Sequence, residues 1–183
     1  MKTIHVFSLF VLVAMAQLFI PSQIIFHQER ILETGTAFKF KTRPVDPSDP
    51  FKGKYIFLNN EINSIETTDS TWMRGEDIYL TITNDSLGFA MAEAVSRDIP
   101  QTSDFVKTQV DWYDKAQEKL RFSFDFDEFY MNETKAYSAE VAHRVAQKDS
   151  DQNNTYALIF VKDGEAVLEN VFINEVPIAE YVE

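Results

Sequence analysis

The chain has 183 residues, enough for one domain of ordinary size once an apolar terminal segment is set aside. Its net charge of −12, from 29 acidic and 17 basic side chains, repels phosphate backbones, so we expect no nucleic-acid partner. The apolar share of 45%, which includes 16 phenylalanines, is enough for a sizeable core and excludes global disorder. Because cysteine is absent, disulfides, thiolate metal sites and a cysteine nucleophile are excluded.

The amino-terminal segment indicates the compartment. Residues 4–20 read IHVFSLFVLVAMAQLFI, and no acidic residue precedes Glu29. One interpretation is a signal peptide with a cleavage site of small residues at Ala14-Met15-Ala16. The other is a retained anchor helix, since residues 4–26 would rise about 34 Å and cross a hydrocarbon core of about 30 Å. We favour the anchor, because apolar residues continue past the candidate cleavage site.

Both interpretations export the carboxyl-terminal part of the chain. The positive charge of Lys2 and the terminal amine favours an amino terminus that stays inside. We therefore expect a single-pass protein of the inner (cytoplasmic) membrane whose carboxyl-terminal domain is extracytoplasmic or periplasmic. Residues 1–35 are the expected anchor helix and stalk, and residues 36–183 the expected domain. Helical character persists to Gly35, and we expect this stalk to lift the domain off the bilayer.

Alternating apolar and polar residues predict strands in the first half of the domain. Thr36–Thr42 places its two phenylalanines on one face and its two lysines on the other. Tyr55–Leu58 is apolar on both faces, which is typical of a central strand or of one crossing between packed layers. A polar connection over residues 63–73 follows. A shared pattern links Lys52–Leu58 with Arg74–Leu80. It indicates either a degenerate internal repeat, whose two strands pair, or two unrelated strand starts.

The second half of the domain reads mostly as strands. The predicted strands are Ile78–Thr83, Phe89–Ser96, Phe105–Tyr113, Lys119–Phe126, Tyr156–Lys162 and Glu165–Ile173. We expect Phe89, Met91 and Val95 to share one face of their strand. Leu120, Phe122, Phe124 and Phe126 should likewise lie on one face, at a spacing of two. The Asp-Gly pair at residues 163–164 suits the tight turn of a hairpin.

One amphipathic helix is predicted after Asn132, which is a good N-cap residue. Tyr137, Val141 and Val145 recur at every fourth position and are flanked by alanines, so this helix is thin enough to lie close on a sheet. The expected fold class is α+β. An N-terminal transmembrane helix and stalk are followed by one mostly antiparallel, β-rich domain with one amphipathic helix.

The stretch from Val45 to Ile62 resembles the signature region of the GDYXXLXY family. The family motif is matched by Gly53, Tyr55 and Leu58, while Lys54 stands where the family has Asp and Asn60 where it has Tyr. The proline- and aspartate-rich approach and two later segments are also similar: Val45-Asp46-Pro47, Asp49-Pro50-Phe51-Lys52, Phe129–Glu133 and Asp163–Asn174. The resemblance implies an envelope protein on a membrane helix, often linked to polytopic membrane partners, with no established activity.

The candidate site consists of motif residues and residues of a matched segment. These are Asp46, Pro47, Asp49, Pro50, Lys52, Gly53, Tyr55, Leu58, Tyr130 and Glu133. A stiff Asp/Pro loop loses little entropy on binding, so we expect a partner-binding or structural role. The expected function is a non-enzymatic, membrane-anchored extracytoplasmic domain that binds a polytopic membrane protein. Residues 4–26 contact the bilayer, and no catalytic residue, metal or cofactor is expected.

Two other functions remain open from the sequence. A hydrolase of envelope polymers would use carboxylates of Asp46, Asp49 and Glu133, provided that two of them converge in one cleft. A Ca²⁺ site would join the two loop aspartates to Asp125 and Asp127. Against the Ca²⁺ site stands ordinary turn chemistry, in which an aspartate beside a proline caps local backbone N–H groups.

Overall fold

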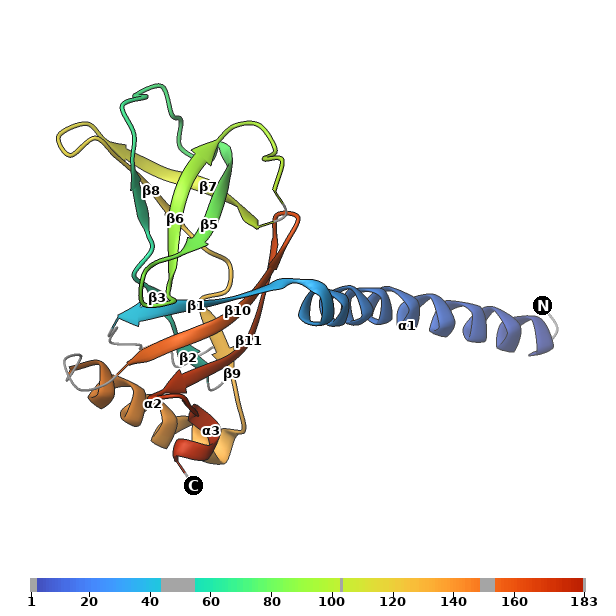
Figure 1. The fold of residues 1–183 in the computed structure, drawn as a ribbon. Helices are drawn as coiled ribbons and strands as arrows, with labels where there is room; N and C mark the ends of the chain where they lie inside the picture. The colour runs from blue at the N-terminus through green and yellow to red at the C-terminus, as the bar shows by residue number, and fades with distance from the viewer. Residues whose placement is uncertain (1–2, 44–54, 103, 149–153, 183) are drawn as a thin grey trace.

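The computed structural model describes residues 3–43, 55–102, 104–148 and 154–182. The first element, α1 (Thr3–Thr34), is a straight extension from the rest of the molecule (Figure 1). Its 32 residues correspond to about 48 Å, and it is long and apolar enough to cross a membrane. The hydroxyls of Ser8 and Ser22 donate to the carbonyls of Ile4 (2.9 Å) and Leu18 (2.8 Å), so neither hydroxyl needs water.

The part that follows Gly35, called the head below, is built on antiparallel sheets. Within the described residues there are two five-stranded sheets and a two-stranded ribbon. The first sheet has the order β12 (Val176–Pro177), β11 (Glu165–Ile173), β10 (Thr155–Lys162), β1 (Thr36–Arg43) and β3 (Asn59–Asn60). The second has the order β4 (Ser64–Glu66), β8 (Lys119–Ser123), β7 (Phe105–Asp114), β5 (Asp77–Asn84) and β6 (Ala90–Ser96). The ribbon pairs β2 (Tyr55–Phe57) with β9 (Glu128–Tyr130).

Two helices complete the head at the end opposite the second sheet (Figure 1). They are α2 (Glu133–Lys148) and the short α3 (Ile178–Tyr181). Asn132 caps α2 as expected, because its side-chain oxygen accepts from the backbone N–H (3.0 Å) and the hydroxyl (2.8 Å) of Thr134. The predicted α+β class, with an apolar helix ahead of a β-rich domain, is confirmed.

An aromatic cluster joins the two sheets through the core. Phe40 of β1 lies edge-on to Phe124 and Phe126, with ring centroids 5.6 and 5.2 Å apart. These two rings stack on each other at 4.7 Å, and Phe124 also meets Phe122 of β8. The predicted face of Leu120 and the three phenylalanines is therefore buried, although β8 itself ends at Ser123.

The β10–β11 hairpin attaches the first sheet to the second. Its turn has positive φ at both Asp163 (50°) and Gly164 (93°), as the Asp-Gly pair predicts. The N–H of Gly164 donates to the carbonyl of Phe105 (3.1 Å), and the N–H of Lys107 donates to the carbonyl of Gly164 (2.8 Å). A Cβ at Gly164 would lie 2.9 Å from the Phe105 ring, so glycine also permits this close approach.

Gly35 alone separates α1 from β1. A Cβ there would lie 2.6 Å from the carbonyl oxygen of Ile31 and 3.0 Å from that of Val161, so only glycine fits. The hydroxyl of Thr34 donates to the carbonyl of Arg30 (2.6 Å) and accepts from the Lys162 ammonium (2.8 Å). The junction is thus held by bonds to both α1 and β10.

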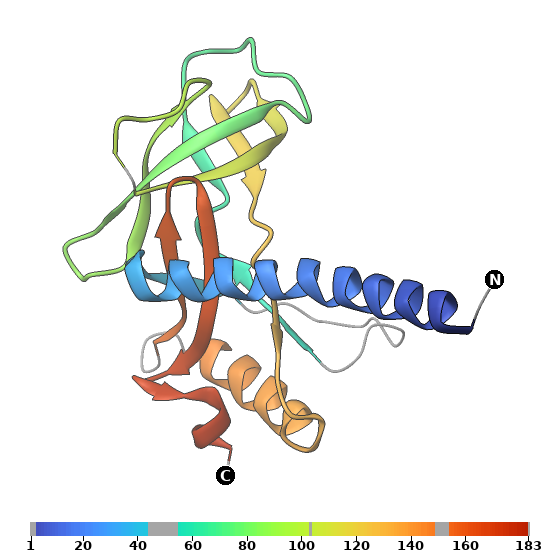
Figure 2. The ribbon, with the colours of Figure 1, turned by 90° about the vertical axis from the view of Figure 1, so that its right-hand side faces the viewer.

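The last turns of α1 pack on the head rather than forming a free spacer. Ile31 is 4% exposed, and His27 contacts the Glu165 carboxylate at the start of β11. Figure 2 shows α1 crossing the β10–β11 hairpin. The expected helical character continues to Thr34, and the last turns of the helix contact the β10–β11 hairpin.

The strands Tyr55–Phe57 and Asp77–Asn84 do not pair, since β2 lies in the ribbon and β5 in the second sheet, which agrees with the alternative of two unrelated strand starts. One prediction about a strand face is wrong. Met91 does not share a buried face with Phe89, since it is 44% exposed. A bulge at Glu93 shifts the register of β6 on β5, so that Ala92 and Val95 are the residues that face the core.

Candidate functional site

Most of the predicted motif lies outside the described residues. Of the expected set, Asp46, Pro47, Asp49, Pro50, Lys52 and Gly53 fall in the segment 44–54. Tyr55 begins β2 opposite Tyr130 of β9, and Leu58 is buried, with its N–H donating to the carbonyl of Asp127 (2.6 Å). The matched segments 55–58 and 129–130 are therefore adjacent in space.

The exposed members of this region are simple surface groups. Tyr130 is 64% exposed, and its hydroxyl donates to the carboxylate of Glu128 (2.5 Å). Glu133 is the first residue of α2, and its side chain lies outside the described groups. Among the described residues, no group of three or more His, Asp or Glu side chains is arranged to hold a metal ion. Asp125 and Asp127 thus form no such group there.

A buried polar cluster lies where α2 meets the first sheet. His143 accepts or donates a hydrogen bond with the Thr42 hydroxyl (3.1 Å), which in turn bonds the Thr155 hydroxyl (3.3 Å). All three side chains are buried, and burial lowers the pKa of His143 to about 4. A threonine beside a neutral histidine has the composition of an activated nucleophile, but no substrate reaches groups buried this deeply. The cluster is structural.

The periodicity of α2 contained the signal for this cluster. His143 shares a helix face with Ala136, Ala139 and Ala146, at spacings of three and four residues, and all four are buried. The sequence analysis took the stripe of larger residues as the packing face instead. The alanine face packs against the strands instead, because its small side chains allow α2 to approach β2 and β10 closely.

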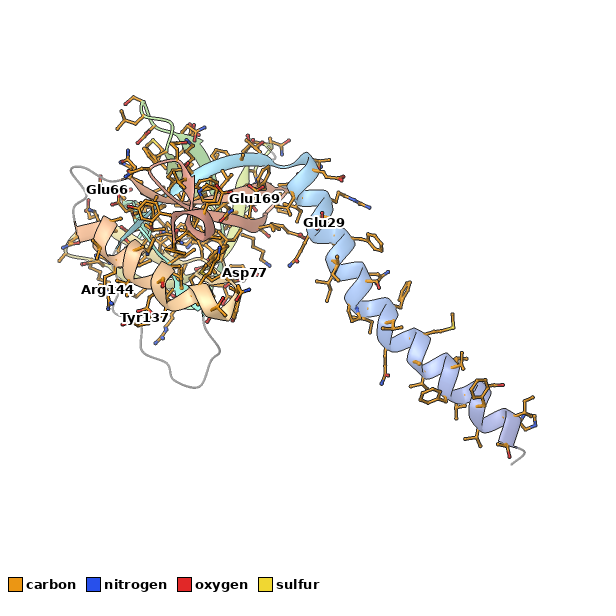
Figure 3. All side chains as sticks on the ribbon, turned by 90° about the horizontal axis from the view of Figure 1, so that it is seen from below. Glu29, Glu66, Asp77, Tyr137, Arg144 and Glu169 are labelled. Carbon is orange, nitrogen blue, oxygen red and sulfur yellow. The ribbon has the colours of Figure 1, made fainter. Side chains whose placement is uncertain are left out.

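The stripe of larger residues on α2, which does not pack on the sheets, borders an exposed groove, named here the α2 groove. Tyr137 and Val145 are 68% and 61% exposed, and Tyr137 points away from the sheets (Figure 3). The groove has a volume of about 450 Å³ and is completed by Tyr181 of α3, which is 45% exposed. The Lys135 ammonium donates to the carbonyl of Ala179 (3.1 Å) and so fastens α3 beside α2. Single exposed apolar residues are ordinary, whereas here Tyr137, Val145 and Tyr181 border one common groove.

A second group of charged side chains converges at Arg97, just after β6. The guanidinium lies 3.7 Å from the centre of the Trp72 ring and donates to Asp69 (2.7 Å) and Glu76 (2.5 Å). Hydrogen bonds from Thr71 and then Arg97 lower the pKa of Asp69 to about 2. Since both carboxylates are held ionised, they are poorly placed to act as a general acid.

Removal of the Arg97 side chain should expose Trp72. In Arg97→Ala we expect the tryptophan emission to shift to longer wavelength and the Asp69 pKa to rise toward its ordinary value, because stacking and ion pairing are both lost. Fluorescence and a pH titration by NMR measure the two effects. Arg74→Ala, in the adjacent turn, is the control. An unchanged emission spectrum in Arg97→Ala would refute the stacking.

Comparison with known proteins identifies the family. The sequence model described as GDYXXLXY protein matches residues 17–171, which is 155 of the 183 residues. No curated protein and no solved structure gives a significant match. The matched range runs from the middle of α1 through the second sheet and α2 into β11, so it includes the resembling segments 45–62 and 129–133 and most of 163–174. The chain therefore belongs to the GDYXXLXY protein family.

Proposed function

We propose that this protein is a single-pass, membrane-anchored domain that works by binding a membrane protein partner rather than by catalysis. In this proposal residues 1–35 are the anchor and stalk, in the inner membrane, and residues 36–183 form the extracytoplasmic or periplasmic domain. The apolar character of α1 supports the anchoring, because none of the side chains in its most apolar stretch is buried and Ile31 is the residue of α1 that the head buries. The weak positive charge at the amino terminus supports the orientation.

The observation that carries the proposal is the α2 groove. Its apolar stripe could have faced the sheets, yet the fold buries the alanine side of α2 and leaves Tyr137 and Val145 exposed. Exposed aromatic side chains bring large apolar area at low entropy cost, which suits a binding surface. A partner helix or strand with an apolar face would cover this groove.

The described strands on either side of segment 44–54 both contact α2. The strand before the loop reaches α2 through the bond between Thr42 and His143, and the strand after it, β2, packs on α2. Segment 44–54 is thus bounded on both sides by contacts with the helix that carries the groove. We infer that Asp46, Asp49 and the motif glycine contribute to the same partner-binding surface.

The tether explains why the partner should be a membrane protein. A head held at the bilayer by α1 meets other proteins of that surface at a raised effective concentration. A modest apolar groove then suffices for association, while soluble proteins of equal affinity bind far less. An exposed groove on a tethered domain therefore favours partners that share the membrane.

Site-specific photocrosslinking tests this function. A photoreactive phenylalanine analogue at Tyr137 should crosslink to a membrane protein in intact cells, whereas the same analogue at Trp112, which is 51% exposed on β7, should not. Val145→Glu should reduce the Tyr137 crosslink at least about tenfold, because it places a charge in an apolar contact. Its melting temperature should stay unchanged, since Val145 is exposed. Equal crosslinking at the two positions, or only soluble products at Tyr137, would overturn the proposal.

A further inference from the structure

A cleft lies between the last turns of α1 and the head. It has a volume of about 790 Å³, and its two walls are α1 from Gln23 to Ile31 and the head around Phe126 and the β10–β11 turn. We propose that this cleft binds one phospholipid with a zwitterionic, ammonium-bearing headgroup. The proposal goes beyond partner binding and rests on the membrane anchoring in the proposed function.

The position of the cleft along α1 places it at headgroup depth. The apolar stretch of the anchor ends at Phe26, and the first charged side chains beyond it are Glu29 and Arg30. A headgroup layer of about 5–7 Å on each side of the hydrocarbon corresponds to roughly three to five helical residues, which fall within residues 27–31. Four of them, His27, Gln28, Arg30 and Ile31, line the cleft, so the lipids around α1 carry their headgroups into it.

The apolar part of the cleft continues the surface of the anchor. Ile24 and Phe26 are 56% and 72% exposed, and they border the cleft on the side toward the apolar segment. Opposite them, Val106, Phe126 and Val167 line the head wall. An acyl chain that packs along α1 would therefore keep apolar contact up to the glycerol backbone. A soluble ligand would gain nothing from this continuity.

The charges that face the cleft select the headgroup. Five titratable side chains line the cleft, and two of them, His27 and Glu165, contact each other. Lys107 pairs with Asp77 outside the cleft (2.7 Å). Arg30 and Asp125 form no ion pair with any residue in the described part of the chain. One free cation and one free anion match a phosphate and an ammonium group, respectively.

An anionic headgroup fits this cleft less well. Its phosphate would still meet Arg30, but the neutral remainder of the headgroup would leave Asp125 unpaired beside it. Burying a carboxylate under a lipid without a counter-ion is unfavourable. A primary ammonium group removes that cost because it donates hydrogen bonds to the carboxylate. The geometry thus favours phosphatidylethanolamine over phosphatidylglycerol.

Lipid retention by the full-length chain tests the proposal. The protein is purified in mild detergent, supplied with equal amounts of phosphatidylethanolamine and phosphatidylglycerol, and examined by native mass spectrometry. We expect one retained phosphatidylethanolamine, at least about tenfold preferred. Arg30→Gln should lower retention of both lipids about tenfold, and Asp125→Asn should abolish the preference. Arg74→Gln and Asp98→Asn remove exposed charges elsewhere on the head and should behave as wild type.

Each other outcome overturns the proposal. Equal lipid retention by wild type and all variants would mean that the retained lipid is nonspecific lipid around the apolar helix. A preference for phosphatidylglycerol would mean that the free cation alone acts. Val167→Trp, which narrows the cleft without a change of charge, should also lower retention and keeps the test independent of Arg30. Incorporation of the same variants into nanodiscs, and their crosslinking at Tyr137, report separately on anchoring and partner binding.

Discussion

Phe40→Ala is expected to lower the free energy of unfolding by about 3–5 kcal/mol, which is the usual cost of truncating a fully buried phenylalanine. Phe40 is 0% exposed and contacts Phe124 and Phe126, which belong to the segment leading from the second sheet to the ribbon. Its loss removes apolar burial from both sheets at once and leaves a cavity. Denaturant unfolding in detergent, followed by circular dichroism, measures the effect.

The matched control is Phe40→Leu, which keeps most of the side-chain volume. We expect it to cost about 1–1.5 kcal/mol, so the difference between the two variants isolates the cavity. Because the phenylalanine cluster spans the two sheets, Phe40→Ala should still unfold in a single transition. Two separated transitions, or a loss below about 1 kcal/mol, would contradict the role of this cluster as the link between the sheets.

The second large effect is a loss of stability in mild acid caused by His143. Burial lowers the pKa of His143 in the folded state to about 4, while the unfolded chain has the ordinary value of 6.5. Below pH 6.5 the unfolded state therefore binds the proton that the folded state refuses, so acid favours unfolding. We expect the contribution of His143 to the free energy of unfolding to be flat above about pH 7.5 and to fall by about 3 kcal/mol between about pH 7.5 and pH 4.

His143→Gln separates this effect from other titrations. Glutamine keeps a hydrogen-bonding group beside Thr42 but does not titrate, so its unfolding free energy should be nearly constant from pH 6.5 to 4.5. The carboxylates with lowered pKa values, such as Asp69 and Glu76, act in a different window, because they lose stability only below about pH 4.5. The same acid slope in wild type and His143→Gln would rule out the histidine as its source.

Local patterns predicted the elements of this fold well. The alternation in residues 36–42, the Asp-Gly turn at 163–164 and the Asn132 cap each depend on interactions within a few residues, and each is found. The short strands β4 and β9 were missed. Residues 64–66 lack clear alternation and form a strand only because β8 offers them an edge to pair with.

Side-chain faces could not be predicted where tertiary packing decides them. On α2 the stripe that begins at Tyr137 and the alanine face around His143 have the same helical period, and only the distance to the sheet selects between them. Within the candidate site, the resemblance identified the segments 55–58 and 129–130, and the structure shows that they pair. It contained no signal for the cleft beside α1, since that cleft forms between residues about 140 positions apart, such as His27 and Glu165.

The single-residue junction at Gly35 has a mechanical consequence. With Thr34 bonded to Lys162 and no room for a larger residue than glycine, α1 and the first sheet are tightly coupled at this junction. Any tilt of α1, whether from bilayer thickness or from a neighbouring helix, therefore swings the far end of the head through a proportional arc. In the membrane-anchored protein that we propose, the tilt of α1 thus sets the angle at which the α2 groove faces its surroundings.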